Sequence, residues 1–231
     1  YKSEHSSNRL LILLHGFISD SQTYTNHIET FLTQCNVLTI DLPGHGQDTS
    51  DMSDTWDFPY IAHALDEVLS QYSMYDVYLL GYSMGGRVAL YYALNGSVAL
   101  RGLLLESTSA GIQSEADKVE RVQVDAARAK VLEIAGLEIF VNDWEKLPLF
   151  RSQYELDAEV RKAIRANRMS QNPVRLAKAL RDYGTGNMPN LWPHVSSLSV
   201  RTLILTGEKD EKFVQIGQKL KEEIPNSHTV Q

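Results

Sequence analysis

Tyr78-Leu79-Leu80-Gly81-Tyr82-Ser83-Met84-Gly85-Gly86-Arg87 is the stretch that decides the fold. In this stretch an apolar run ends in the pattern Gly-x-Ser-x-Gly, and residues 88–95, which suit a helix, follow at once. Strand, tight turn and helix form the context in which this pattern marks a nucleophile elbow. The turn is expected to hold Ser83 in a strained backbone conformation, and the flanking glycines leave room for neighbouring backbone to pass closely. A turn that merely joins a strand to a helix has the same letters, so the rest of the chain has to decide.

On both sides of the elbow, short apolar runs alternate with segments of helical spacing. Continuous apolar runs bounded by polar or Gly/Pro-rich loops are typical of strands that are buried on both faces. Their alternation with helices predicts a parallel α/β sheet with right-handed crossovers. The predicted strands are residues 10–14, 37–40, 77–80, 102–105 and 202–205 with a last strand from His228, and the predicted helices are residues 21–34, 59–72 and 213–223.

Residues 111–187 break this rhythm, because they contain no buried apolar run. We therefore expect a helical insertion that lies over the sheet as a cap. The four expected cap helices are residues 114–135, 137–143, 157–168 and 173–183. The expected organisation is a sheet domain at residues 1–109, the cap at residues 110–190, and the remainder of the sheet domain at residues 191–231.

The composition is that of an ordinary globular protein and excludes several classes. The chain has 231 residues, of which 43% are hydrophobic and 22% charged, so it can bury a sizeable core without covalent cross-links. Its single cysteine, Cys35, cannot form an intrachain disulfide and fits a reducing compartment such as the cytoplasm. The net charge of −7 argues against a nucleic-acid partner, and no apolar run approaches the roughly 18–20 residues of a membrane span. We find no metal-binding cluster and no phosphate loop in the sequence, so we expect no cofactor.

Cationic side chains are concentrated in the middle of this acidic chain. Residues 111–190 hold 13 Lys/Arg and 12 Asp/Glu, whereas the remainder holds 9 Lys/Arg and 17 Asp/Glu. Most of these charges belong on solvated helix faces. The local surplus also favours a patch that receives a small anionic ligand.

The loops that end the predicted strands carry motifs in a specific order. This order resembles that of the α/β-hydrolase superfamily over nearly the whole chain. The motifs are Leu14-His15-Gly16-Phe17, Asp41-Leu42-Pro43-Gly44-His45-Gly46, the elbow, and Gly207-Glu208-Lys209-Asp210. A narrower resemblance is to the 2-succinyl-6-hydroxy-2,4-cyclohexadiene-1-carboxylate synthases of menaquinone (vitamin K2) biosynthesis. It rests on Gly81-Tyr82-Ser83-Met84-Gly85-Gly86-Arg87, Glu120-Arg121, Asp143-Trp144 with Pro148 and Phe150, and Arg168.

Ser83 is the first candidate catalytic residue, since it lies at the carboxyl end of a parallel strand, where open α/β sheets bind ligands. Met84 opens the following helix, so its N–H has no partner within the helix and favours negative charge. The loop after the first strand supplies a second N–H, at Phe17. Together the two donors predict an oxyanion hole.

Asp210 follows a strand and a turn, which is the location of the acidic triad residue in the superfamily it resembles. Glu208 and Glu211 compete for this role, and an ordinary turn aspartate is the plainer alternative. A histidine must complete the triad, and only His228 lies beyond Asp210. His228 opens a strand rather than following one, so we expect the last strand to be cut and both the catalytic histidine and the closing helix to lie outside the given chain.

Three arginines are candidate ligands for carboxylates, which guanidinium groups bind bidentately. Arg87 lies one helical turn after Ser83, and Arg121 and Arg168 come from different helices of the insertion. For Arg121 the plainer alternative is an ion pair with Asp125 on the same helix, whereas Arg168 has no such partner four residues before it. Trp144 and Tyr82 are candidates for an apolar wall, although Trp144 fits the core of the cap nearly as well.

The narrower resemblance implies a carbon–oxygen lyase that removes pyruvate from 2-succinyl-5-enolpyruvyl-6-hydroxy-3-cyclohexene-1-carboxylate, a small polycarboxylate. A Ser–His–Asp relay that serves as a base fits this reaction. The first alternative is a serine esterase or thioesterase that forms an acyl-enzyme, because a fold does not fix a reaction. The second alternative, if the protein has no catalytic histidine, is an inactive relative that only binds its ligand.

Overall fold

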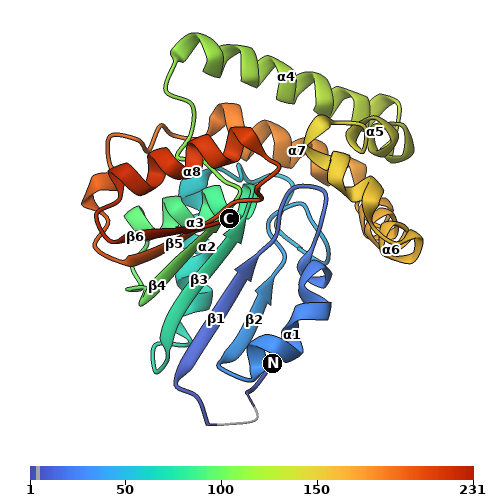
Figure 1. The fold of residues 1–231 in the computed structure, drawn as a ribbon. Coiled ribbons are helices and arrows are strands. Elements are labelled where there is room, and N and C mark those ends of the chain that lie inside the picture. Colours follow the sequence, from blue (N-terminus) through green and yellow to red (C-terminus); the bar gives the residue numbers. More distant parts are fainter. Residues whose placement is uncertain (4–5) are drawn as a thin grey trace.

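The computed structural model describes residues 1–3 and 6–231, and its centre is a six-stranded parallel sheet (Figure 1). The strand order is β2-β1-β3-β4-β5-β6. The strand that leads to the elbow, β3, therefore lies inside the sheet, where both of its edges are paired. The strands are β1 (Arg9–Leu14), β2 (Asn36–Ile40), β3 (Asp76–Tyr82), β4 (Gly102–Glu106), β5 (Arg201–Leu205) and β6 (Ser227–Val230).

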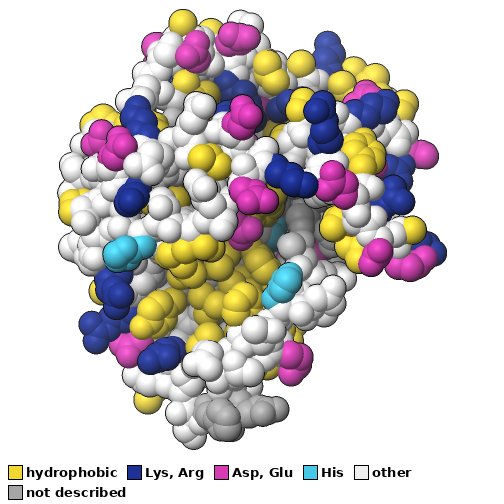
Figure 2. Space-filling model, in the orientation of Figure 1, with side chains coloured by type: hydrophobic (Ala, Val, Ile, Leu, Met, Phe, Trp, Pro, Cys, Tyr) yellow, Lys and Arg dark blue, Asp and Glu magenta, His cyan; other side chains and the backbone are white. Residues whose placement is uncertain are grey.

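Alternate residues of the strands supply two hydrophobic layers, as the two-residue period of a strand requires. Leu10, Ile12 and Leu14 of β1 join the large core, together with residues of α2 (Phe58–Ser70), α3 (Met84–Asn95) and α8 (Glu211–Glu223). Leu11 and Leu13 point to the other face and pack with Ile28 of α1 (Thr25–Leu32), which follows the 3-10 helix η1 (Ser21–Tyr24). Part of this second face is only half-buried in the described chain, at Tyr78, Leu104, Leu203 and Leu205, and hydrophobic side chains gather on the sheet in Figure 2.

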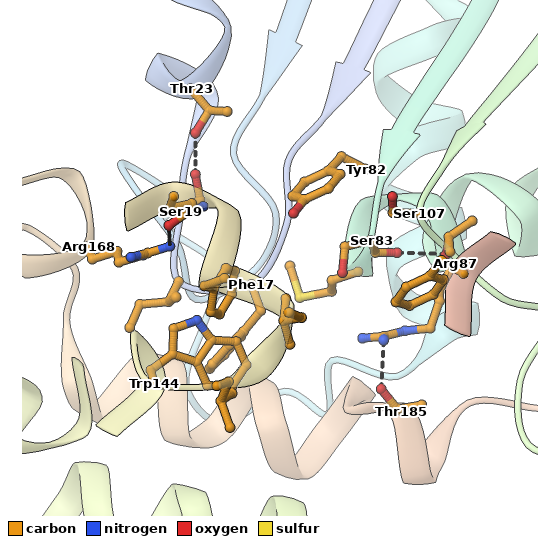
Figure 3. A pocket seen from close by; sticks show the side chains of 18 of the residues that line it. Phe17, Ser19, Thr23, Tyr82, Ser83, Arg87, Ser107, Trp144, Arg168 and Thr185 are labelled. Carbon is orange, nitrogen blue, oxygen red and sulfur yellow. Dashed lines mark hydrogen bonds between the residues drawn. The ribbon is translucent and has the colours of Figure 1, made fainter. Parts of the chain in front are cut away.

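Between β4 and β5 the chain forms helices that lie across one end of the sheet (Figure 1). These helices lie at the carboxyl end of the strands, because the elbow that follows β3 faces them (Figure 3). The helices have a small core of their own, in which Ala129, Leu132, Phe140 and Leu176 pack together with Ile18 of the sheet domain. They are α4 (Glu115–Ile134), α5 (Leu137–Trp144), η2 (Pro148–Glu155), α6 (Ala158–Met169), α7 (Pro173–Tyr183) and η3 (Thr185–Asn187), followed by η4 (Val195–Ser197). We call α4–α7 the cap helices, and the division of the chain at residues 110 and 190 stays a prediction.

A buried polar network fastens the cap helices to the loops below them. Asp20, which is 3% exposed, accepts hydrogen bonds from the side chains of Asn167 (2.7 Å), near the end of α6, and Gln171 (3.0 Å), just after it. Gln171 in turn accepts from the backbone N–H of Gly46 at 2.9 Å. Breaking such a network would leave buried polar groups without partners, so it holds the cap in one position over the sheet.

The sequence did not predict η2, since its eight residues have neither the length nor the spacing of an α-helix. The last strand begins at Ser227, one residue before the predicted start. In the described parts of the chain no helix combines the length and the apolar character that crossing a membrane requires. Acidic and basic side chains are mixed on the surface over α5 and α6 in Figure 2, as expected for solvated helix faces.

Candidate active site

The elbow has the strained backbone that the sequence predicted. Ser83 has φ 52° and ψ −109°, a combination that a residue with a side chain rarely adopts. Its N–H donates to the Glu106 carbonyl at 2.8 Å, and its own carbonyl accepts from the Thr108 hydroxyl at 2.8 Å. The neighbouring β4 strand and its loop thus hold the turn, while the Ser83 hydroxyl makes no hydrogen bond to any described residue. This geometry goes beyond what a plain connecting turn needs.

The glycines of the elbow are required by close backbone contacts. A Cβ atom on Gly81 would strike the backbone of Gly85, and one on Gly85 would strike the Leu14 carbonyl at the end of β1. These contacts bring the start of α3 against the end of β1, and Phe17, Ser83 and Met84 all line one cavity. The N–H groups of Phe17 and Met84 donate to no described residue, so both are free to receive negative charge.

A cavity of about 1400 Å³ lies between the elbow and the cap helices. Figure 3 shows Tyr82, Ser83 and Arg87 on one side of it and Phe17, Trp144 and Arg168 on the other. The cavity brings together all the predicted site residues except Asp210: Phe17, Tyr82, Ser83, Met84, Arg87, Arg121, Trp144 and Arg168. In residues 1–3 and 6–231 no three His, Cys, Asp or Glu side chains are grouped so that they could hold a metal ion.

Arg87 and Arg121 form a cationic cluster with one buried carboxylate. Arg121 Nε donates to Asp125 Oδ1 at 2.9 Å, which is the ion pair that the sequence offered as the alternative to ligand binding. Arg87 donates from Nη1 to the neutral hydroxyl of Thr185 at 2.6 Å (Figure 3), and its buried Nε has no partner among the described residues. Burial, and next the charge of Arg121, lower the pKa of Arg87 to about 10. The cluster therefore has more positive charge than its one carboxylate neutralises.

Arg168 has no ion pair within its own helix, as expected, but it pairs with an acidic residue from another part of the cap. Its Nη1 donates to Glu145 Oε1 and its Nη2 to Gln153 Oε1, both at 3.0 Å. Glu145 also pairs with Arg165 at 2.6 Å, so two guanidinium groups share one carboxylate. Arg168 is 7% exposed and stacks over the Phe150 ring at 4.8 Å. The pairing joins α6 to the residue after α5, a contact that helical spacing cannot reveal.

Trp144 packs against the core of the cap and also lines the cavity, which are the two positions that the sequence left open for it. It stacks on Phe140 of the cap core, with ring centroids 5.6 Å apart, and it also lies edge-on to Phe17 at 5.3 Å. Its indole N–H is buried without a hydrogen-bond partner. Tyr82 lies across the cavity in Figure 3, where burial and, next, the charge of Glu106 raise its pKa. The two side chains thus supply part of the apolar wall.

Asp210 lies outside the lining of the cavity. Its carboxylate accepts a hydrogen bond from the Phe213 N–H at 3.2 Å and so caps the start of α8. Its charge is nevertheless felt at Tyr82, where it contributes to the raised pKa. The structure therefore gives Asp210 a helix-capping role and leaves its triad role a prediction.

No histidine of the described residues lines the cavity. His15 accepts from the Leu42 N–H through Nε2 at 2.9 Å and so ties together the loops that follow β1 and β2, and burial lowers its pKa. His45 contacts the Pro43 carbonyl and the Tyr183 hydroxyl. His228 is an exposed residue of β6. His15 and His45 thus order the loops in which they lie, and the strand position predicted for His228 is confirmed.

The sequence analysis missed three residues of the cavity region. Ser107, directly after β4, lines the cavity with a positive φ of 44°, and its position at a strand end beside the elbow was the available signal. Arg128 also lines the cavity, seven residues after Arg121 on the same helix. Glu145, the partner of Arg168, gave no signal because the two residues are far apart in the sequence.

Comparison with known proteins agrees with this architecture. A family model described as alpha/beta hydrolase fold matches residues 9–231, which defines the class of protein. A Bacillus subtilis (strain 168) protein, provisionally named 2-succinyl-6-hydroxy-2,4-cyclohexadiene-1-carboxylate synthase, is 34% identical over 96% of this chain and 81% of its own length. The synthase of that name from Salmonella agona (strain SL483) is 33% identical over 91% of this chain and 81% of its own length. The chain belongs to this family of synthases within the α/β-hydrolase class.

Solved structures show the same relation. The structure of MenH from S. aureus superposes with a TM-score of 0.99, at 59% identity over 100% of this chain and 86% of that one. A thermophilic esterase from Thermogutta terrifontis, solved with malate bound, superposes with a TM-score of 0.82 at 25% identity, over 97% of this chain and 80% of that one.

Proposed function

We propose that this chain, within its full-length protein, is a carbon–oxygen lyase of menaquinone biosynthesis. Its reaction eliminates pyruvate from 2-succinyl-5-enolpyruvyl-6-hydroxy-3-cyclohexene-1-carboxylate and gives 2-succinyl-6-hydroxy-2,4-cyclohexadiene-1-carboxylate. The observation that carries the proposal is the unbonded Ser83 hydroxyl in one cavity with the cationic cluster of Arg87 and Arg121. A substrate with three carboxylates suits such a cavity, and the names of the Salmonella and Bacillus relatives specify this product.

The elbow supplies a base in this proposal. Ser83 takes the proton from the ring carbon that bears the succinyl group, which lies next to a ketone. The charge moves onto the ketone oxygen, where the N–H groups of Phe17 and Met84 stabilise the enolate as an oxyanion hole does. The carbon–oxygen bond to the enolpyruvyl group then breaks, the ring gains its second double bond, and the released enolpyruvate takes up a proton to become pyruvate.

Carboxylate binding falls to Arg87, Arg121 and Arg168 in this proposal, and Tyr82 and Trp144 form the apolar wall beside the ring. A bound carboxylate would accept hydrogen bonds from donors that have no acceptor among the described residues, such as the buried Nε of Arg87. No cofactor has a role in the reaction.

We further propose that an imidazole oriented by Asp210 relieves Ser83 of its proton. Since no histidine of the described residues lines the cavity, we infer that this imidazole comes from a segment that follows β6. β6 is parallel to β5, and Val230 pairs with Leu205. The chain therefore leaves β6 at the same end of the sheet at which the chain leaves β5 toward Asp210. The free cysteine and the metabolic class of the relatives favour a cytoplasmic enzyme.

The assay that tests the function measures pyruvate release from the enolpyruvyl substrate by the full-length protein, with hydrolysis of a p-nitrophenyl ester measured beside it. We expect fast pyruvate release and slow ester hydrolysis. The malate-bound esterase at 25% identity favours acyl transfer as the second candidate. Rapid ester hydrolysis without pyruvate release would support that candidate and refute the lyase.

A further inference from the structure

A third guanidinium group belongs to the cationic cluster. Arg128 follows Asp125 by three residues on α4, and its Nη1 lies 3.8 Å from the same Asp125 oxygen that Arg121 contacts at 2.9 Å. Its side chain lines the cavity and lies over the Trp144 ring at 5.3 Å from the centroid. Residues spaced by four and then three positions lie on one face of a helix, so Asp125 lies between the two arginines, and both arginines line the cavity.

The charges of the cluster do not balance. Asp125 is 3% exposed and is the carboxylate that Arg121 and Arg128 share, while its other oxygen accepts from the Gly186 N–H at 3.3 Å. Arg87 adds a third positive charge and is bonded there to a hydroxyl. Burial and, next, the charge of Arg121 lower the pKa of Arg128, as expected where like charges crowd together. In the described part of the chain, three guanidinium groups around one carboxylate leave two positive charges without an acidic partner.

A second cationic group, formed by Arg165 and Arg168, has a smaller excess of positive charge. There Glu145 faces two guanidinium groups, those of Arg165 and Arg168, so one positive charge is left over. Arg87, Arg121, Arg128 and Arg168 all line the cavity, so an anion bound there can reach their unmatched charge, whereas Arg165 keeps 37% of its side chain exposed to solvent. The cluster therefore suits two carboxylates and the second group suits one.

We propose that Arg128 is a specificity-determining residue that, with Arg87 and Arg121, makes the cluster a receptor for two carboxylates of one ligand. Arg128 contacts one carboxylate directly, and its stacking on Trp144 fixes the direction of its guanidinium group. The inference deepens the proposed function, on which it rests for the natural substrate. Small anions with two carboxylates should then bind better than those with one.

The test compares Arg128→Met, Arg128→Lys and Lys130→Met in the full-length protein. Lys130 is an exposed cation on α4 and serves as the matched control. The probes are succinate and butyrate, which have four carbons each and differ in one carboxylate, with binding measured by calorimetry. We expect wild type and Lys130→Met to prefer succinate by about 10-fold or more, and Arg128→Met to lose most of that preference. Arg128→Lys keeps the charge and should retain part of it, which separates ligand binding from a folding defect.

Kinetics give the second readout. Arg128→Met should raise the KM for the enolpyruvyl substrate by about 10-fold with kcat changed by less than about 3-fold, as expected for lost binding. If Arg128→Met matches Lys130→Met in both the succinate preference and KM, the inference is wrong, while pyruvate release by the wild type still upholds the function. If the wild type releases no pyruvate, the function fails, and the succinate and butyrate titrations alone decide on Arg128.

Discussion

Although the chain is acidic overall, individual arginine side chains form a site that suits anions. Arg87, Arg121 and Arg128 lie close together, and among residues 1–3 and 6–231 Asp125 is the one carboxylate that pairs with the group. This arrangement costs folding free energy, because burial and like charges both oppose ionisation. Such residues are common in binding sites, since the ligand supplies the missing charge. The lowered pKa of Arg87 records this cost.

The pKa of Arg87 leads to a prediction for ligand binding at high pH. The cation binds carboxylates and the neutral form does not, so succinate affinity should be full below the pKa of about 10 and should fall as the pH rises through it. Calorimetry at about pH 8.5 and about pH 11 measures the change, and carboxylates stay ionised throughout this range. Burial raises the pKa of both Tyr82 and Tyr183 above the ordinary tyrosine value, and the Arg87→Met variant separates the titration of Arg87 from that of other groups. An affinity that stays constant in the wild type, or that falls equally in Arg87→Met, contradicts this assignment.

Asp210 has two possible roles that one pair of variants separates. An asparagine side chain still accepts the Phe213 N–H and caps α8 but lacks the charge that orients an imidazole. Asp210→Asn should therefore keep the free energy of unfolding within about 0.5 kcal/mol of wild type, while Asp210→Ala should lose about 1 kcal/mol. Pyruvate release by Asp210→Asn should fall by at least about 100-fold. A fully active Asp210→Asn enzyme would reduce Asp210 to a helix cap.

At the scale of elements, strands and helices of the sheet domain followed directly from the sequence. The buried apolar runs predicted both ends of each strand from β1 to β5 to within two residues, because a strand that is covered on both faces must be apolar throughout. The elbow was predictable for a different reason, since the contacts of Gly81 and Gly85 with neighbouring backbone exclude any side chain. The 3-10 helix η2 was not predictable, because a short helix of this kind depends on contacts with its neighbours.

Gly85 offers a test of the elbow as an element. In Gly85→Ala the new methyl group meets the carbonyl groups of Leu14 and His15, which are backbone atoms and cannot move aside easily. We expect a loss of about 1–3 kcal/mol in the free energy of unfolding, measured by urea denaturation, together with lost pyruvate release. Gly207→Ala is the matched control, because nothing lies within 4 Å of its added methyl group. Equal stability of the two variants would show that the elbow is looser than described.

In the whole molecule the cap helices lie across the end of the sheet (Figure 1). The cavity is lined by Ser83 and Arg87 of the sheet domain and by Arg121 and Arg168 of the cap helices. The sequence predicted which residues line this cavity better than it predicted the side chains with which those residues pair. Arg87, Arg121, Trp144 and Arg168 were found through the resemblance to the synthase family together with the chemistry of their side chains, whereas the pair of Arg168 with Glu145 joins residues 23 positions apart. Contacts of this kind arise from the packing of the cap helices and have no periodic signal. The position of Asp210, outside the cavity lining, was hidden for the same reason.

The central claim is that Ser83 acts as a base beneath the arginines of the cap. Single-turnover measurement of pyruvate release by full-length wild type and Ser83→Ala tests it most directly, with mass spectrometry of the wild-type protein during turnover. We predict a rate about 1000-fold or more lower in Ser83→Ala, substrate affinity within about 3-fold of wild type, and no mass added to the wild-type protein. Wild-type rates in Ser83→Ala, or a covalent acyl group on Ser83, would contradict the account.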